Sequence, residues 1–131
     1  MAGQKLDNIG TIKMQVLEDA LVLLTRINGL VEQYGMAVKG NQPTSQWLAN
    51  IRRTLPTLAA NLKSHFGMIS DQVLAVNLAS SRGASEAVRL RALREGVALV
   101  KQAIEIGLTQ TKVKHTIKGE SASPAGGEGA A

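Results

Sequence analysis

The stretch of sequence that decides the fold is WLANIRRTLPTLAANLKSHFGMISDQVLAV, residues 47–76. When it is placed on a helix at about 100° per residue, its large apolar side chains fall on one face. No other stretch of the chain keeps its phase for so long. It predicts a long amphipathic helix packed against an apolar core. The stripe consists of Trp47, Leu48, Ile51, Leu55, Leu58, Leu62, Phe66, Ile69, Val73 and Val76.

Pro56 interrupts this stretch. A proline in a helix interior lacks the backbone N–H and clashes with the preceding turn, at a cost of roughly 3 kcal/mol. Pro56 points away from the stripe, however, and the stripe keeps its phase across it. We therefore expect one helix over 44–80 that bends at Pro56. The alternative is a chain split at Pro56, which would give a four-helix bundle.

Two further helices are predicted, over about 11–38 and about 85–112, by apolar residues at spacings of three and four. Thr11 and Ser85 are suitable N-caps, and Gly83 suits the position after a helix C-terminus. Short connections make consecutive helices antiparallel neighbours. The expected fold is therefore all-α, an elongated antiparallel three-helix bundle.

A chain of 131 residues is expected to form one domain. Residues 1–10 lack periodicity and should be a flexible lead to a bundle over 11–118. Residues 119–131 are rich in Gly, Ala and Ser, which predicts a disordered tail. We see no secretory signal and no apolar run near the roughly 20 residues of a membrane span, so we expect a soluble, cytoplasmic protein.

The residue types present argue against catalysis. The absence of cysteine excludes disulfides, thiolate metal sites and cysteine nucleophiles. Acidic residues lie singly on predicted solvent faces, and His65 and His115 have no nearby carboxylate partners with which to hold a metal. We therefore expect no enzymatic activity, no cofactor and no small-molecule substrate. His65, beside Phe66 at the edge of the stripe, is expected to be a half-buried packing residue.

The net charge of +5 is concentrated in residues 82–118, which hold eight Lys or Arg and three Glu. Such a basic region can attract nucleic acid through its phosphates without sequence preference, or anionic lipid. The candidate anion contacts are Arg89, Arg91, Arg94 and Lys101. A solvated helix face is the alternative, because Arg91 and Lys101 each precede a glutamate by four residues.

The predicted third helix is apolar over about 200° of its circumference, which indicates neighbours on two sides. Its second ridge, where another helix could approach closely, consists of Ala92, Gly96, Leu99, Ala103 and Ile106. We therefore expect a protein–protein interaction or assembly module that self-associates through this ridge into a homo-oligomer. An amphipathic coat of a granule or membrane surface is an alternative, because the wide apolar faces with few aromatics are similar in texture to phasins of polyester granules.

His115-Thr116-Ile117-Lys118-Gly119 resembles the His-x-Leu-Lys-Gly signature of histidine phosphotransfer domains. Members of that family are helical bundles that carry a phosphoryl group on this histidine. The resemblance covers five residues and implies phosphotransfer at His115. In the family the histidine lies within a bundle helix and further helices follow, whereas here a Gly/Ala-rich segment follows.

Overall fold

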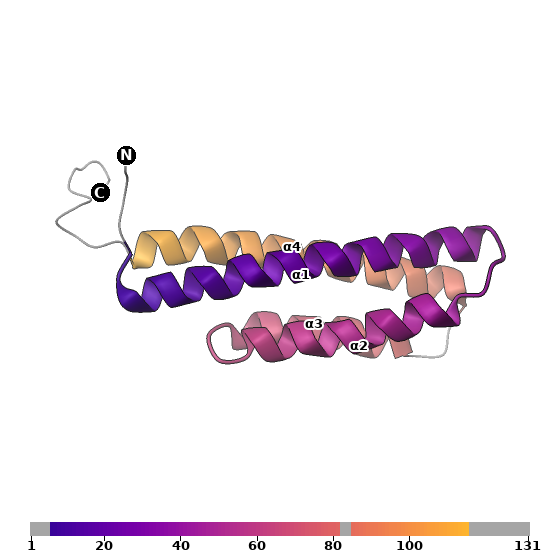
Figure 1. The fold of residues 1–131 in the computed structure, drawn as a ribbon, viewed down its shortest axis with the longest axis horizontal. Helices are drawn as coiled ribbons and strands as arrows, with labels where there is room; N and C mark the ends of the chain where they lie inside the picture. The colour runs from indigo at the N-terminus through magenta and orange to yellow at the C-terminus, as the bar shows by residue number, and fades with distance from the viewer. Residues whose placement is uncertain (1–5, 82–84, 116–131) are drawn as a thin grey trace.

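The computed structural model describes residues 6–81 and 85–115, which form four helices. Their bounds are Asn8–Lys39 for α1, Ser45–Leu62 for α2, Gly67–Ser81 for α3 and Glu86–Lys114 for α4. Each helix packs against two others in the ring order α1, α2, α3, α4, and within the described ranges the backbones of diagonal pairs do not approach closely. The helices run side by side as an elongated antiparallel bundle (Figure 1).

The all-α class predicted from the sequence is confirmed, but the single helix predicted over 44–80 is wrong. The chain reverses at residues 63–66, between α2 and α3, so that four helices replace the predicted three. The alternative of four helices agrees with the structure, but its position for the split is wrong, because Pro56 lies inside α2, which is continuous from Ser45 to Leu62.

The turn between α2 and α3 explains why the sequence pattern was misleading. Residues 63–65 are polar and exposed, and the Phe66 amide donates to the Leu62 carbonyl at 2.7 Å, which closes the turn. Leu62 and Ile69 are seven residues apart and both contribute to the same core. A stripe at this spacing looks the same whether the helix continues or folds back on itself, so periodicity alone cannot distinguish the two.

Aliphatic side chains and one tyrosine fill the core. The predicted central stripe is buried on both α2 and α3, with Trp47 and Phe66 half-buried at its edge. Removal of this apolar surface from water is the main favourable term, at roughly 25 cal/mol per Å². The largest fully buried side chains are Tyr34, Leu17, Ile27, Ile51, Leu55, Leu58, Leu62, Leu93, Ile104, Val31, Val73 and Val100.

Small residues bring α3 close to both of its neighbours. A β-carbon built on Gly96 of α4 would lie 2.5 Å from Cγ2 of Val76, so glycine is needed where α4 approaches α3. On the other side, the buried Ser70 hydroxyl donates to the Ala59 carbonyl of α2 at 2.8 Å. Gly96, which the sequence placed in a ridge between subunits, therefore belongs to a contact within the chain.

The helix ends are set by capping side chains. Asp7 is the N-cap of α1 and accepts a hydrogen bond from the Gly10 amide at 2.6 Å, so that the helix begins before the predicted cap at Thr11. Because α1 begins at Asn8, Gly10 lies within the helix and is buried in the bundle. Ser85 caps α4 as predicted, because its side-chain oxygen accepts a hydrogen bond from the Val88 amide.

Parts of the predicted lead and tail lie outside the described residues. Of the predicted flexible lead, residues 6–10 are described, and they are helical from Asn8 onward. Residues 116–118 of the predicted bundle and the predicted tail over 119–131 are not among the described residues. No helix in the described ranges is long and apolar enough to cross a membrane.

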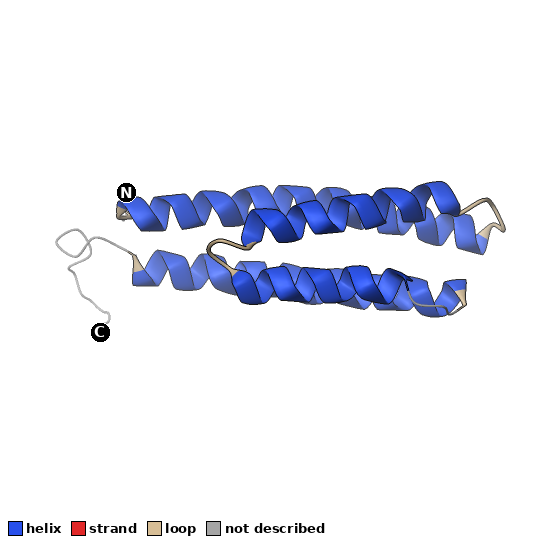
Figure 2. Cartoon of the chain, turned by 90° about the horizontal axis from the view of Figure 1, so that it is seen from below, coloured by secondary structure: helices blue, strands red, loops and turns tan. Residues whose placement is uncertain are grey.

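The two pairs of helices differ in length. At about 1.5 Å per residue, the 32 residues of α1 and the 29 of α4 extend well beyond the 18 of α2 and the 15 of α3. The α2–α3 hairpin starts from the C-terminal end of α1, and its turn stops short of the other end (Figures 1 and 2). The first turns of α1 and the last turns of α4 therefore lack a covering helix.

Leu62 tests the burial of the stripe beside the turn. Because its side chain is fully buried, Leu62→Ala should cost roughly 2–5 kcal/mol through lost burial and a residual cavity. Leu74 of α3, which is 46 % exposed, is the matched control, and Leu74→Ala should cost less than about 1 kcal/mol. Urea denaturation measures both, and equal losses would contradict this account of the core.

Candidate functional site

Exposed apolar side chains gather on α3 and α4. Eleven large hydrophobic side chains are exposed in residues 6–81 and 85–115, and seven of these lie on α3 and α4. On α4, Leu99, Ile106 and Val113 are 58 %, 49 % and 75 % exposed. They recur every seven residues, so they follow one line along the helix. In the described ranges, α3 and α4 therefore carry more exposed large apolar side chains than α1 and α2.

An open groove of about 320 Å³ lies between α3 and α4. Val76 and Gly96 are in contact at its floor, and small side chains line its walls. Three alanines, Ala75, Ala79 and Ala92, leave room for a side chain, and the lining also includes the polar Gln72 and Glu95. We use the name α3–α4 face for this groove surface together with two exposed side chains beyond its end, Met68 and Ile106; within the groove the face consists of Ala75, Ala79, Ala92 and Leu99.

The ridge predicted on the third helix lies on the side of α4 that faces α3. Gly96 is used within the chain, and Ala92 and Leu99 line the groove. Ala103 is half-buried, and Ile106 is exposed farther along the helix. The predicted ridge is thus divided between an internal helix contact and exposed surface.

The four predicted anion contacts do not act as one basic surface. The Arg89 side chain is only 15 % exposed and pairs with Glu86 at 3.1 Å. Arg94 pairs with Glu32 of α1 at 3.3 Å. Arg91 and Lys101 are exposed on α4. Two of the four cations are therefore engaged by carboxylates of the same chain, which reduces the positive surface that remains for a nucleic acid.

A polar cluster around Glu86 was not found from the sequence. The fully buried Tyr34 donates its hydroxyl to Glu86 Oε1, Thr44 donates to Oε2 at 2.7 Å, and Arg89 pairs with the same carboxylate. The cluster joins α1, the start of α2 and α4. The hydrogen bond from Tyr34 lowers the pKa of Glu86, while burial raises the pKa of Tyr34. The one signal in the sequence was a tyrosine on an apolar stripe, whose hydroxyl needs a partner when buried.

Asp7 and His115 tie the beginning of α1 to the end of α4. The Asp7 carboxylate lies 3.2 Å from His115 Nδ1, and the Asp7 amide donates to the His115 carbonyl at 2.9 Å. The hydrogen bond from the Gly10 amide is the main cause that lowers the pKa of Asp7. Gly10 packs directly against the His115 side chain. We call this contact the terminal tie.

The terminal tie bears on the resemblance to phosphotransfer domains. A histidine that accepts a phosphoryl group must present one ring nitrogen to an incoming donor in line with the leaving group. His115 Nδ1 faces Asp7, and Nε2 is buried without a hydrogen-bond partner. Neither nitrogen is open in this arrangement, which does not favour phosphotransfer at His115.

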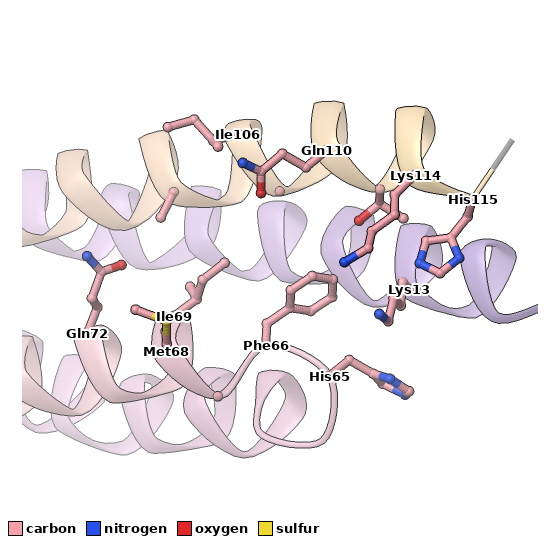
Figure 3. Close-up of a pocket in the computed structure, with 14 residues that line it drawn as sticks. Lys13, His65, Phe66, Met68, Ile69, Gln72, Ile106, Gln110, Lys114 and His115 are labelled. Atoms are coloured by element: carbon pink, nitrogen blue, oxygen red, sulfur yellow. The ribbon is translucent and has the colours of Figure 1, made fainter.

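A pocket of about 490 Å³ lies where the α2–α3 turn stops short of the ends of α1 and α4. We call it the terminal pocket. Its apolar lining includes Phe66, Met68, Ile69 and Ile106, and Figure 3 shows Phe66 projecting from the turn toward α4. The pocket is therefore walled by α1, the turn, α3 and α4.

The terminal pocket is basic at one end. Lys13 comes from α1, Lys114 and His115 come from the end of α4, and His65 lies on the turn (Figure 3). His65 is exposed, so the half-buried packing role predicted for it is wrong. It lies in the turn between α2 and α3, which the apolar periodicity did not predict. No lining residue is acidic. Among the residues described, no group of three or more His, Cys, Asp or Glu could hold a metal ion.

Gly10 tests the terminal tie. A β-carbon at this position would collide with the His115 side chain, so Gly10→Ala should separate α1 from α4 there and speed hydrogen exchange at both ends. Gly29→Ala is the control, since its β-carbon would meet nothing within 4 Å. That variant should gain about 0.5–1 kcal/mol of stability from helix propensity alone. The same gain in Gly10→Ala would contradict the close packing.

Glu86 should make the stability of the folded protein depend on pH. Because its pKa is lowered in the folded protein, its contribution is present above its ordinary value of 4.5 and is lost as pH falls through the folded pKa. Glu86→Gln should lower stability at neutral pH and reduce the loss between about pH 7 and about pH 3. Urea midpoints across this range measure the effect. Glu18→Gln, at an exposed carboxylate of α1, should follow the wild type.

Comparison of the chain with protein-family models, with curated proteins and with solved structures finds no match.

Proposed function

We propose that the protein is a non-enzymatic assembly module that forms a homo-oligomer through the α3–α4 face. The observation that carries this proposal is the exposure of Leu99, 58 % accessible, beside an open groove whose lining includes three alanines. Monomeric proteins expose single hydrophobic residues freely, but a run of them beside a groove is typical of interaction surfaces.

A second copy of the chain is the favoured occupant, because the α3–α4 face carries both halves of a contact. Leu99 and Ile106 project from α4, whereas Ala75 and Ala79 of α3 form a wall of the groove. In a twofold arrangement each copy presents the same surface to the other. The large side chains of one copy can then enter the alanine-lined groove of its partner, as ridges enter grooves between packed helices.

The expected affinity is moderate. Complete burial of a large aliphatic side chain contributes roughly 1.5–3 kcal/mol, and a twofold contact buries Leu99 and Ile106 twice. Association costs roughly 4–15 kcal/mol in lost freedom of motion, which offsets much of this gain. Because Leu99 and Ile106 are already about half-buried in the single chain, the gain is smaller than for full burial, and we expect a dimer that forms only at high protein concentration rather than an obligate one.

Leu99→Glu tests the face directly. The side chain is exposed in the monomer, so the variant should fold with unchanged helicity but should bring two carboxylates into an apolar contact. We expect its dimer dissociation constant to rise at least about tenfold. Val22→Glu is the matched control, because Val22 is 71 % exposed on α1. Sedimentation equilibrium across protein concentrations measures all three proteins.

Two outcomes would contradict the proposal. A wild-type protein that is monomeric at every concentration would exclude a second copy as the occupant. Equal effects of Leu99→Glu and Val22→Glu would move the contact away from the α3–α4 face. A monomer that adsorbs to oil droplets through Leu99 would favour the alternative of an amphipathic coat.

A further inference from the structure

We propose that the terminal pocket binds a single-chain amphiphile with an anionic head group, such as a fatty acid. The inference comes from a cavity apart from the groove around Leu99 and does not rest on self-association. It combines three observations: a pocket of ligand size, a basic end and an apolar end. The volume of about 490 Å³ falls in the range typical of small-molecule sites, roughly 300–1,000 Å³.

The basic end of the terminal pocket is suited to a carboxylate. Lys13 and Lys114 reach it from different helices, and Figure 3 shows the Lys114 side chain extending into the space above Phe66. Neither lysine forms an ion pair with a residue in the described part of the chain. The one carboxylate nearby, Asp7, is held by the Gly10 amide and His115. An anionic head group would therefore meet two amines without a competing carboxylate.

The other end of the terminal pocket is suited to a hydrocarbon chain. Phe66 and Ile69 form a wall on the side of the hairpin, and Ile106 contributes to the lining from α4. Met68 is 85 % exposed at the rim, and its flexible thioether can close over a bound chain. Figure 3 shows Gln72, Met68 and Ile106 away from the end where Lys13, Lys114 and His115 lie. The separation of charge from apolar surface matches an amphiphile lying along the pocket.

The length of the hairpin explains why such a pocket exists in this bundle. Had α2 and α3 been as long as α1 and α4, their side chains would fill this space, as they do along the rest of the core. The turn at 63–66 instead leaves Phe66 and Ile69 facing a hollow. Apolar walls of this kind lose contacts unless something fills the hollow, and a hydrocarbon chain restores those contacts without unsatisfied polar groups.

Calorimetric titration of the full-length protein with laurate, kept below its micelle concentration, tests the proposal. We expect saturable binding of one laurate per chain, and binding at least about tenfold weaker for dodecyltrimethylammonium, whose head group is a cation. Lys13→Gln combined with Lys114→Gln should weaken laurate binding about tenfold or more. Lys101→Gln is the matched control, because this lysine is exposed on α4 and does not line the terminal pocket.

Chain length and pocket shape give a second set of measurements. From hexanoate to decanoate, the dissociation constant should fall about threefold to fourfold for each added methylene. Ala103→Trp should abolish binding by filling the pocket. Met68→Glu is the second variant, because a side chain that is 85 % exposed can be changed without loss of the fold, and its charge should oppose the bound chain.

Four results would overturn the proposal. Equal affinity for acetate, inorganic phosphate and laurate would define a simple anion site without a place for the chain. Binding to phosphatidylglycerol vesicles without binding to laurate would indicate adsorption to a membrane surface. Laurate binding that is unchanged in the Lys13/Lys114 double variant, or in Met68→Glu, would move the site elsewhere. At protein concentrations where the wild type is monomeric, Leu99→Glu should bind laurate like the wild type, because Leu99 does not line the terminal pocket.

Discussion

The turn at residues 63–66 is the constraint on which the rest of the structure depends. Its position divides one long apolar stripe into two helices that bury their stripes in the same core. Each arm of the hairpin then needs a long helix on its open side, which α1 and α4 provide. Because the arms are shorter than α1 and α4, the bundle is closed along most of its length and open at one end.

The position of α3 follows from this hairpin and determines the outer surface of the protein. Its exposed side chains include Met68, Leu74 and Leu78, so α3 is apolar on sides that the bundle does not cover. Gly96 allows α4 to approach α3 closely at Val76. The groove beside this contact is open, and most of its exposed surface is apolar.

Much of the fold could be predicted from the sequence, because helix periodicity is local information. The outer helices and the cap at Ser85 follow from such patterns. The turn could not be predicted, since Leu62 and Ile69 keep their spacing through it. The partner of the buried Tyr34 hydroxyl, Glu86, lies 52 residues away, so no local pattern could join them.

The terminal pocket was beyond sequence reasoning for a different reason. Lys13, Phe66 and Lys114 are far apart in the chain, and they meet around a space that exists only because a helix ends early. The apolar pattern of one helix predicts which of its faces is buried. It does not predict where a neighbouring helix ends, and the uncovered ends of α1 and α4 depend on that.

The two proposed surfaces meet at Ile106 and Met68, which line the terminal pocket and also belong to the α3–α4 face. A hydrocarbon chain that contacts Ile106 from inside the pocket changes the apolar area that a second copy of the protein can cover from outside. If both sites are occupied in solution, their binding free energies are therefore coupled. Such coupling is reciprocal, so the effect of an amphiphile on dimer affinity must equal the effect of the dimer on amphiphile affinity. The short hairpin, which opens the pocket and places Met68 at its rim, is the physical origin of that connection.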